Sequence, residues 1–317
     1  MRSLVAGCAG FIGAALAERL LADGHDVVGV DCLITGLRSN VGRLTRSERF
    51  EFLELDICGP IPMEGPFDWI FHLASPASPR DYDRFPLETL RANSLGTWQL
   101  LELAQRSGAS FFLASTSEIY GVATVAPQPE TYWGNVNPVG PRSPYSEAKR
   151  FAEALTTAFG AERGVPVRIG RLFNVYGPGM RLDDGRVTSE FFRQALLGSP
   201  LEIHGDGRQI RCLTYVDDAV SGILAIATHA DSRPVNVGDP KGEVSVTELA
   251  RHIAAISDST TTARHVPSRP EDPLARVPDI ARAQSLGWQP RTALEDGLRR
   301  TYAWFATGDG RWATMGT

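Results

Sequence analysis

Residues 3–13 read SLVAGCAGFIG, and this stretch decides how the rest of the chain is interpreted. A short apolar run is followed by Gly7, Gly10 and Gly13 in a GxxGxxG pattern, which opens an apolar helical pattern over residues 13–22. Gly7 permits a tight turn, Gly10 lets a pyrophosphate approach the backbone, and Gly13 allows a helix to pack closely on a strand. The helix start offers free N–H groups and partial positive charge. The stretch therefore predicts a strand–turn–helix unit that binds a dinucleotide.

An acidic residue at the end of the next apolar run supports this interpretation. Asp31 stands 24 residues after Gly7, where a carboxylate accepts hydrogen bonds from the adenosine ribose hydroxyls. The same carboxylate repels a 2′-phosphate and so favours NAD over NADP, although Arg38 weakens that inference because an arginine accommodates the phosphate. Asp56 follows the third apolar run, where it either meets the adenine amino group or only caps a strand end. Both interpretations of Asp56 stay open.

Short apolar runs recur through the first half of the chain at spacings typical of strand–helix–strand units. Each run is continuous rather than alternating, as expected of strands that are covered on both faces of a parallel sheet. The predicted strands are residues 3–6, 26–30, 50–55, 68–73, 110–114 and 165–172, and the clearest helical patterns are 13–22, 87–107 and 145–163. This alternation predicts an α/β fold with a doubly wound parallel sheet, the Rossmann arrangement.

The pattern becomes irregular after residue 175, which predicts two domains. We expect residues 1–175 to form the dinucleotide-binding domain and residues 176–317 to form a smaller C-terminal α/β domain that binds substrate. Strand-like pieces at 213–215 and 235–237 predict that a segment of about 210–240 returns to the first domain.

The composition narrows the class of protein. The 317 residues carry 32 Lys and Arg against 37 Asp and Glu, so the formal net charge is −5. An acidic chain argues against binding to nucleic acid or to an anionic membrane, since both need a clustered positive field. No apolar run approaches the roughly 18–20 residues that span a bilayer. The N-terminus imitates an export signal, but Cys8 comes too early for the apolar stretch that such a signal needs.

The cysteines indicate a reducing compartment. Cys8, Cys32, Cys58 and Cys212 form no CxxC pair and have no metal-ligand spacing. We therefore expect reduced thiols in a cytoplasmic protein, with no bound metal.

Two further motifs suggest the chemistry. Tyr145 and Lys149 form a YxxxK pair on a predicted helix, where the two side chains share one face. The unperturbed pKa of tyrosine is about 10, and a neighbouring ammonium stabilises the phenolate and lowers that pKa toward neutral pH. Ser115-Thr116-Ser117-Glu118 follows a predicted strand, and the carboxyl ends of such strands line the active crevice. A hydroxyl there can orient a substrate alcohol beside the phenolate.

With these motifs the chain resembles the extended short-chain dehydrogenase/reductases that act on nucleotide sugars, and among them the UDP-glucuronate decarboxylases (UDP-xylose synthases). The matching stretches are GxxGxxG at 7–13, HLASPASP at 72–79, ASTSEIYG at 114–121, YWGNVNPVGPRSPYSEAKR at 132–150, RLFNVYGPGMRLDDGRV at 171–187, IRCLTYVDD at 210–218 and PDI at 278–280. They cover nearly the whole chain. Two residues depart from the family pattern. Arg181 stands where decarboxylases commonly carry His, and Ala92 where Thr commonly precedes Asn93; either could alter the cofactor cradle or the substrate preference.

The resemblance implies NAD as cofactor and a UDP-sugar as substrate, held by the second domain. It implies NAD contacts at Gly7, Phe11, Ile12, Asp31, Asp56, Ile57, Leu73 and Lys149, and we add Gly10, Gly13, Ala74, Ser75, Asn93 and Tyr145 to the expected set. It also implies Tyr145 as proton acceptor, Thr116 as its hydroxyl partner and Glu118 as a residue special to decarboxylation. Expected substrate contacts near the sugar or its diphosphate are Asn174, Arg186, Arg211, Arg276 and Ser117.

The implied reaction oxidises C4 of UDP-glucuronate, loses carbon dioxide from the resulting β-keto acid and reduces the ketone again, giving UDP-xylose with internal recycling of NADH. Glu118 would destabilise the carboxylate or relay a proton. Three alternatives stay open: a UDP-glucuronate 4-epimerase, a nucleotide-sugar 4,6-dehydratase and a non-catalytic NAD-binding scaffold. By the same resemblance, Glu118 argues against the epimerase, because related epimerases commonly have a small or hydroxyl residue there. Ser117 argues against the dehydratase, because dehydratases typically have an Asp-Glu pair where this chain has Ser117-Glu118. Intact Thr116, Tyr145 and Lys149 argue against the scaffold.

Other prominent residues are expected to be structural. We expect His72 to be packed and hydrogen-bonded rather than catalytic. Trp98, Phe151 and Phe159 lie on helical patterns and are expected in the core or at a helix interface. Related folds pair two such helices per subunit, so the resemblance implies a homodimer.

Overall fold

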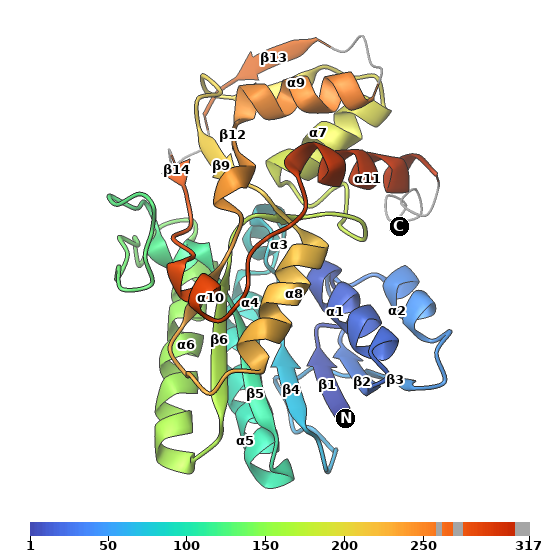
Figure 1. The fold of residues 1–317 in the computed structure, drawn as a ribbon, viewed down its shortest axis with the longest axis vertical. Coiled ribbons are helices and arrows are strands. Elements are labelled where there is room, and N and C mark those ends of the chain that lie inside the picture. The colour runs from blue at the N-terminus through green and yellow to red at the C-terminus, as the bar shows by residue number, and fades with distance from the viewer. Residues whose placement is uncertain (258–261, 269–274, 308–317) are drawn as a thin grey trace.

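The computed structural model describes residues 1–257, 262–268 and 275–307. Its main sheet has seven parallel strands in the order β11-β6-β5-β4-β1-β2-β3 (Figure 1). The strands are β1 (Arg2–Ala6), β2 (Asp26–Asp31), β3 (Phe50–Glu54), β4 (Trp69–His72), β5 (Ser110–Thr116), β6 (Val167–Leu172) and β11 (Val235–Val237). The chain runs outward from β1 to β3 and then from β4 to β6 on the other side. The predicted doubly wound sheet is therefore confirmed.

The continuous apolar runs are explained by a core on each face of the sheet. In β1, Leu4 and Ala6 pack into one core and Val5 into the other. Successive side chains of a strand point to opposite faces, so a strand that is covered on both sides is mainly apolar at consecutive positions.

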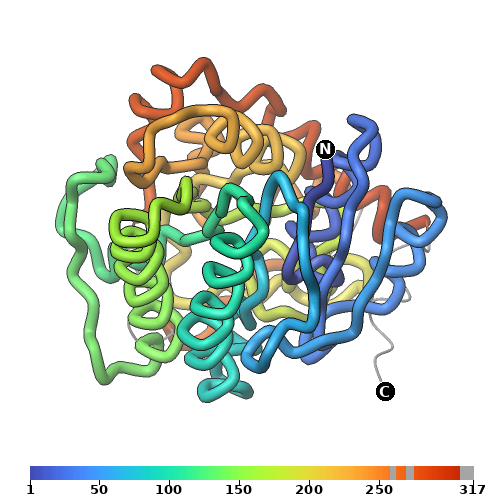
Figure 2. The backbone as a smooth tube through the Cα atoms, turned by 90° about the horizontal axis from the view of Figure 1, so that it is seen from below, coloured from blue at the N-terminus to red at the C-terminus, as the bar shows by residue number. Residues whose placement is uncertain are grey.

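Helices cover both faces (Figures 1 and 2). One face carries α1 (Phe11–Ala22) and α8 (Val216–Ala227), with α2 (Arg38–Leu44) beside α1. The other face carries α4 (Pro86–Arg91), α5 (Thr97–Ser107) and α6 (Ser143–Arg163). Figure 2 shows α5 and α6 side by side beneath the sheet.

The helix predicted over residues 87–107 is interrupted. A five-residue π-helical segment, η1 (Ala92–Gly96), separates α4 from α5. Within it, Asn93 Nδ2 donates a hydrogen bond to Thr89 O at 2.8 Å. A Cβ on Gly96 would lie 2.6 Å from Ile57 Cδ1, so this turn packs closely on the loop after β3. Such local widening depends on tertiary contacts and leaves no periodic signal.

A second, smaller region lies above the carboxyl ends of the strands (Figure 1). It contains α7 (Val187–Leu196), α9 (Val246–Ile256), α11 (Leu294–Ala306), a three-stranded sheet of β9 (Ile210–Cys212), β12 (Glu243–Ser245) and β14 (Ala275–Arg276), and the parallel pair β8 (Leu201–His204) and β13 (Ala263–Val266). Connecting elements are α3 (Pro79–Arg84), η2 (Ser117–Tyr120), η3 (Pro240–Gly242) and α10 (Ala281–Ser285).

The chain passes between the two regions more than once. After β9 in the upper region, β10 (Thr214–Tyr215) pairs with β7 (Val175–Tyr176) in a separate two-stranded sheet. Helix α8 then packs on the main sheet, and β11 pairs with β6 at its edge. The division at residue 175 and the return of a segment of about 210–240 to the first domain stay predictions.

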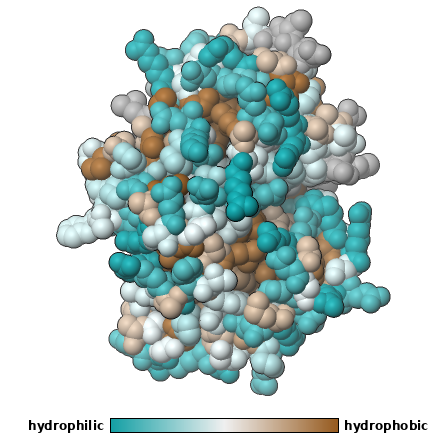
Figure 3. Space-filling model, viewed as in Figure 1, coloured by the Kyte–Doolittle hydropathy of each residue, from teal (hydrophilic) through white to brown (hydrophobic). Residues whose placement is uncertain are grey.

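The face of the molecule in Figure 3 is mostly hydrophilic, with smaller hydrophobic patches. Among the described residues, no helix is both long and apolar enough to cross a membrane.

Candidate active site

A cavity of about 480 Å³ lies at the carboxyl ends of the central strands, where the main sheet meets the upper region. A smaller cavity of about 100 Å³ adjoins it. Gly7, Gly10, Thr35, Leu73 and Ser75 line both cavities. Together the two cavities form one groove across the strand ends, where ligands bind in doubly wound sheets.

The glycine-rich turn sits at the centre of this groove. Gly7 has a φ of +89°, and a Cβ there would lie 2.7 Å from the backbone N of Ala74. A Cβ on Gly13 would lie 2.0 Å from Gly7 O, whereas one on Gly10 would meet only Gly7 O, at 3.2 Å. Helix α1 starts after Gly10 with no side-chain cap and no acidic residue in its first turn. Phe11, Ile12 and Gly13 line the larger cavity. The turn leaves space and free N–H groups for an anion.

Asp31, at the end of β2, lines the smaller cavity. Its two carboxylate oxygens accept hydrogen bonds from Ala9 N at 3.0 Å and Leu33 N at 2.8 Å. Burial raises the pKa of Asp31, and these two hydrogen bonds oppose the rise. The carboxylate therefore joins the glycine-rich turn to the loop after β2.

Asp56 and Ile57 also line the smaller cavity. Asp56 Oδ1 accepts a hydrogen bond from Cys58 N at 2.9 Å, so it does cap the end of β3. Its position in the cavity wall leaves the adenine contact open as well.

The residues after β4 form the opposite wall of the groove. Leu73 and Ser75 line both cavities, and Ala74 lines the smaller one. Asn93 lines neither cavity. It is buried, and its Nδ2 donates to Oγ of the cavity-lining Ser75 at 2.8 Å. This groove fits a dinucleotide, because it combines the glycine-rich turn, the start of α1 and the acid Asp31 with two adjoining cavities.

The YxxxK pair lies on α6 against the end of β5. A hydrogen bond between Tyr145 and Thr116 lowers the pKa of the phenol, but burial dominates and raises it to about 12. Burial lowers the pKa of Lys149 to about 7, against the opposing charge of Glu153. Lys149 Nζ donates to Ala114 O at 2.7 Å. In this arrangement the amine of Lys149 is bound to a backbone carbonyl, and burial outweighs the groups that lower the pKa of Tyr145.

A second tyrosine fixes the ring of Tyr145. Tyr82, on α3, stacks on it with ring centroids 5.3 Å apart and an interplanar angle of 9°. Both side chains are buried. Offset stacking of this kind adds about 0.5–1.5 kcal/mol beyond burial, so Tyr82 holds the phenol in one orientation.

Glu118 is held by two arginines. Its Oε1 lies 2.5 Å from Arg276 Nη1, and Arg142 Nη1 lies 3.3 and 3.4 Å from its two oxygens. Burial alone would raise the pKa of Glu118, but the charges and hydrogen bonds of Arg276 and Arg142 outweigh it and lower the pKa to about 2. Glu118 is therefore a carboxylate at neutral pH, and the three groups together carry one net positive charge.

Two of the hydrogen-bond donors of Arg276 are unpaired among the described residues. Arg276 is 7% exposed and lines the larger cavity. Among the residues that the structure describes, its Nε and Nη2 are buried without a hydrogen-bond partner. A buried unpaired donor is costly, more so when it is charged. The arrangement therefore favours a negative charge near Glu118 and the buried Ser117 in the same wall.

The other expected substrate residues also line the larger cavity. Asn174, with a φ of +36°, donates to Cys212 O at 3.3 Å. Arg211 Nη1 donates to Ile210 O at 2.9 Å. Arg186 pairs with Asp184 at 2.6 Å and donates to Ala77 O at 3.0 Å.

Three features of the site were missed in the sequence analysis. Arg142 lies three residues before Tyr145, just ahead of α6, and this spacing was a usable signal. Tyr82 and Asp81, on the short helix α3, lie in no periodic pattern, and nothing local marks them. Arg181 was noted only as a departure from the family, and it is paired with Asp81 at 3.0 Å.

Within residues 1–257, 262–268 and 275–307, no cluster of His, Cys, Asp and Glu could hold a metal ion. His72 is buried and lies 3.1 Å from Thr97 Oγ1 through its Nε2. Burial lowers the pKa of His72 to about 3, so it is a neutral packed histidine, as predicted.

Comparison with known proteins agrees with this geometry. Residues 3–238 match the model of the NAD dependent epimerase/dehydratase family. The chain is 45% identical over 305 residues to a UDP-glucuronic acid decarboxylase 1 of Xenopus tropicalis, covering 96% of this chain and 72% of that protein.

Solved structures are similar over the full fold. A UDP-glucose 4-epimerase of Thermotoga maritima, with UDP-glucose, superposes with a TM-score of 0.89 at 31% identity, covering 97% of this chain and 99% of that one. A UDP-glucuronic acid 4-epimerase of Bacillus cereus, in complex with UDP-glucuronic acid and NAD, gives a TM-score of 0.85 at 30% identity, again covering 97% and 99%.

Proposed function

This chain belongs to the NAD-dependent epimerase/dehydratase family, and from that membership we propose that it is a UDP-glucuronate decarboxylase that forms UDP-xylose through a 4-keto intermediate. Its 45% identity to a UDP-glucuronic acid decarboxylase exceeds its 30% identity to the UDP-glucuronic acid 4-epimerase. The structure adds a physical reason, because the buried guanidinium of Arg276 lines the larger cavity beside Glu118.

NAD is the cofactor. When bound, it supplies a hydride acceptor and donor, together with a positive ring charge. The glycine-rich turn and the start of α1 would hold its diphosphate, Asp31 its adenosine ribose, and the wall after β4 the rest. This assignment rests on the open space at Gly10 and on the two adjoining cavities.

Tyr145 would take the proton of the sugar 4-hydroxyl, and Thr116 would orient that hydroxyl. Burial raises the pKa of the Tyr145 phenol to about 12. Its activation therefore requires positive charge brought near it, and Lys149, with a pKa of about 7, is one source within the protein. Arg186 and Arg276 also act electrostatically on Tyr145.

The observation that carries the proposal is the Glu118–Arg276 pair. Arg276 is buried and lines the cavity, two of its nitrogens have no hydrogen-bond partner among the described residues, and its charge lowers the pKa of Tyr145. A carboxylate on the carbon next to the reacting C4 would lie beside this guanidinium, whose positive charge suits it. Oxidation at C4 makes the substrate a β-keto acid: the bond between C5 and the carboxyl carbon breaks, carbon dioxide leaves, and the electron pair passes to the C4 ketone as an enolate. Protonation at C5 and return of the hydride then give UDP-xylose.

Glu118 then acts as a fixed carboxylate and not as an acid, because its pKa is about 2. It sets the position of Arg276 and shares its charge, so that the substrate carboxylate is bound without full neutralisation. Ser117 would contact the same carboxylate or a water. Asn174, Arg186 and Arg211 would contact the sugar nucleotide, and their positions in the cavity wall support this.

The 4-epimerase remains the second candidate, because two related epimerases share the fold at TM-scores of 0.89 and 0.85. Incubation of the holoprotein with UDP-glucuronate separates the two, with product mass and carbon dioxide as readouts. We expect carbon dioxide and UDP-xylose in equal amounts. UDP-galacturonate without carbon dioxide would establish the epimerase instead, and the absence of any turnover would overturn both.

Assembly and location follow as parts of the proposal. Leu87, Leu90, Leu95, Trp98 and Phe151 are between 40% and 68% exposed on the neighbouring elements α4, η1, α5 and α6. Exposed apolar side chains gathered on these neighbouring elements support a homodimer that buries them. The four cysteines are all free thiols, which supports a cytoplasmic location.

A further inference from the structure

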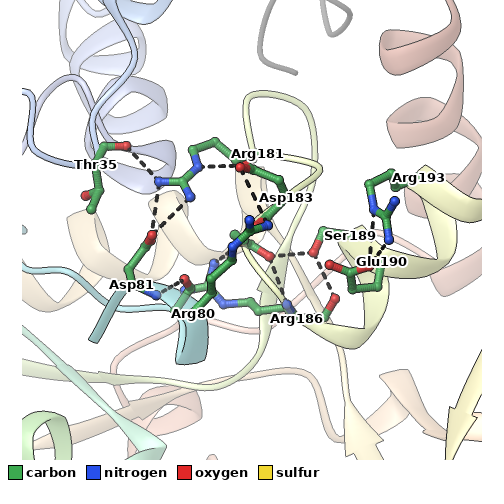
Figure 4. Close-up of polar contacts among 11 residues, drawn as sticks. Thr35, Arg80, Asp81, Arg181, Asp183, Arg186, Ser189, Glu190 and Arg193 are labelled. Atoms are coloured by element: carbon green, nitrogen blue, oxygen red, sulfur yellow. Dashed lines mark hydrogen bonds and ion pairs between the residues drawn. The ribbon is translucent and has the colours of Figure 1, made fainter. Parts of the chain in front are cut away.

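The segment between β7 and α7 lines the larger cavity and is fastened to the cavity's opposite wall (Figure 4). We call this segment, residues 177–186, the strap. Arg186 Nη2 donates to Ala77 O at 3.0 Å, and Arg80 Nη1 donates to Asp183 O at 2.9 Å. The most extensive fastening is made by Arg181.

Arg181 binds three groups at once. Its Nη2 and Nη1 lie 3.0 and 3.4 Å from the two oxygens of Asp81, Nη1 donates to Thr35 O at 3.2 Å, and Nε donates to Asp183 Oδ1 at 3.1 Å. The side chains of Arg181 and Asp81 are only 18% and 11% exposed. A forked, largely buried pair of this kind fixes geometry far better than an exposed ion pair does.

The charges show that Arg181 is a fastening and not a ligand contact. One guanidinium faces two carboxylates, those of Asp81 and Asp183, so it has no net positive charge to offer to a diphosphate. Burial would lower the pKa of Arg181, but the two carboxylates outweigh it and raise the pKa. Arg276 differs in this respect, because two of its nitrogens have no partner.

The elements that the strap joins all belong to the groove. Thr35 lies in the loop after Asp31 and lines both cavities. A Cβ on Gly179 would lie 3.7 Å from the ring of Phe11, at the start of α1. Asp81 lies on α3 across the groove and lines the larger cavity. The strap is therefore bonded to the loop after Asp31 and to α3, and its backbone at Gly179 passes near Phe11 at the start of α1.

We propose that Arg181 is a positioning residue that clasps the strap to Thr35 and Asp81 across the cofactor groove, and that this clasp sets how slowly the dinucleotide leaves. The proposal rests on the proposed function in that the groove holds NAD. Retention matters for that reaction because the reduced cofactor must stay bound until the ketone is reduced again. If NADH dissociates early, the 4-keto intermediate cannot be reduced.

The test measures release of NADH from the holoprotein, by fluorescence during a chase with excess NAD. Arg181→Ala removes all three bonds, and Asp81→Asn removes the charge on the α3 side. Arg193→Ala is the matched control, since Arg193 pairs with Glu190 at 2.6 Å on α7 without crossing the groove (Figure 4). We expect release from Arg181→Ala to be about tenfold faster than from wild type, because loss of such a contact acts mainly on the dissociation rate.

Asp81→Asn should speed release by a similar factor, and the double variant should add little, because both changes break one clasp. Arg193→Ala should release NADH at the wild-type rate even if its melting temperature falls. Wild-type release from Arg181→Ala, equal acceleration in Arg193→Ala, or additive effects of Arg181→Ala and Asp81→Asn would each overturn the proposal. These rates need no turnover, so a wild-type protein that binds NADH but forms no UDP-xylose would refute only the proposed function.

Discussion

Arg276 Nη1 lies 2.5 Å from Glu118 Oε1, although the two residues are 158 positions apart in the chain. Glu118 follows the central strand β5, and Arg276 ends β14 in the upper region. This pair therefore closes the cavity from both regions and places a charged, partly unsatisfied guanidinium near Tyr145.

Replacement of Glu118 by Gln should separate oxidation from decarboxylation. The amide keeps the shape of the side chain but removes the negative charge beside Arg276 and Arg142. The bound substrate carboxylate is then stabilised in its charged form, and its loss as carbon dioxide is slowed. We expect carbon dioxide release to fall by about 100-fold or more. NADH formation on addition of UDP-glucuronate, followed by absorbance, should fall by less than about tenfold.

Glu147→Gln is the matched control for this prediction, because Glu147 pairs with the exposed Arg150 at 3.6 Å and does not line the larger cavity. It should leave both signals unchanged. Equal loss of NADH formation and carbon dioxide release in Glu118→Gln would remove Glu118 from the decarboxylation step.

Replacement of Tyr145 by Phe should abolish NADH formation, because it removes the proton acceptor and leaves the stack on Tyr82 intact. A loss of about 100- to 10,000-fold is expected for a general base. Tyr132→Phe, at a tyrosine that lies 3.3 Å from Thr124 Oγ1 away from the cavity, should behave as wild type. An undiminished NADH signal from Tyr145→Phe would show that another group is the base.

The strands and the glycine-rich turn were predictable because their signals are local. An apolar run such as residues 110–114 marks a buried strand by itself, and Gly7 and Asp31 are separated by a single strand–helix unit. The charge state of Glu118 was not predictable, since it depends on Arg276, which only the folded chain brings near. The same holds for Lys149: the helical spacing placed it beside Tyr145, but its bond to Ala114 O is a tertiary contact.

Replacement of Asp31 by Ser should weaken discrimination between NADH and NADPH. The change removes the charge that would repel a 2′-phosphate and weakens the bonds to Ala9 N and Leu33 N. We expect the Kd for NADH to rise by about 10- to 100-fold, equal to about 1.4–2.7 kcal/mol, with the Kd for NADPH unchanged or lower. Asp26→Ser, at the exposed opposite end of β2, is the control in the same fluorescence titrations. A constant ratio of the two Kd values would refute this role of Asp31.

Introduction of a charge at Trp98 should disrupt the proposed dimer. Trp98 is 42% exposed and packs edge-on against Phe159 at 5.7 Å, so a glutamate there would be buried without a partner if the helix faces associate. Light scattering should give twice the mass of one chain for wild type and the mass of one chain for Trp98→Glu. Leu197→Glu, at a residue that is 66% exposed at the end of α7, should remain dimeric. A monomeric wild type would refute the proposal of a dimer.

The buried amine of Lys149 should make stability depend on pH in a defined direction. Its pKa is about 7 in the folded protein and 10.5 as an unperturbed group, so between these values the unfolded chain binds one proton more than the folded chain. The free energy of unfolding therefore rises with pH through that window, by about 1.4 kcal/mol per pH unit at most. Below pH 7 the penalty for burying the charged amine is complete. Lys149→Met has no titrating amine at this position, so it lacks this pH dependence of the free energy of unfolding.

Urea unfolding of nucleotide-free wild type and Lys149→Met, at intervals from pH 6 to pH 9, tests this directly. Every other titrating group is common to the two proteins, so the difference between their unfolding free energies isolates Lys149. We expect that difference to move in favour of wild type by about 2–3 kcal/mol between pH 7 and pH 9, and to be flat below pH 7. Parallel stability curves would show that Lys149 keeps an ordinary pKa in the folded protein, and the source of positive charge for Tyr145 would then be a permanently charged amine.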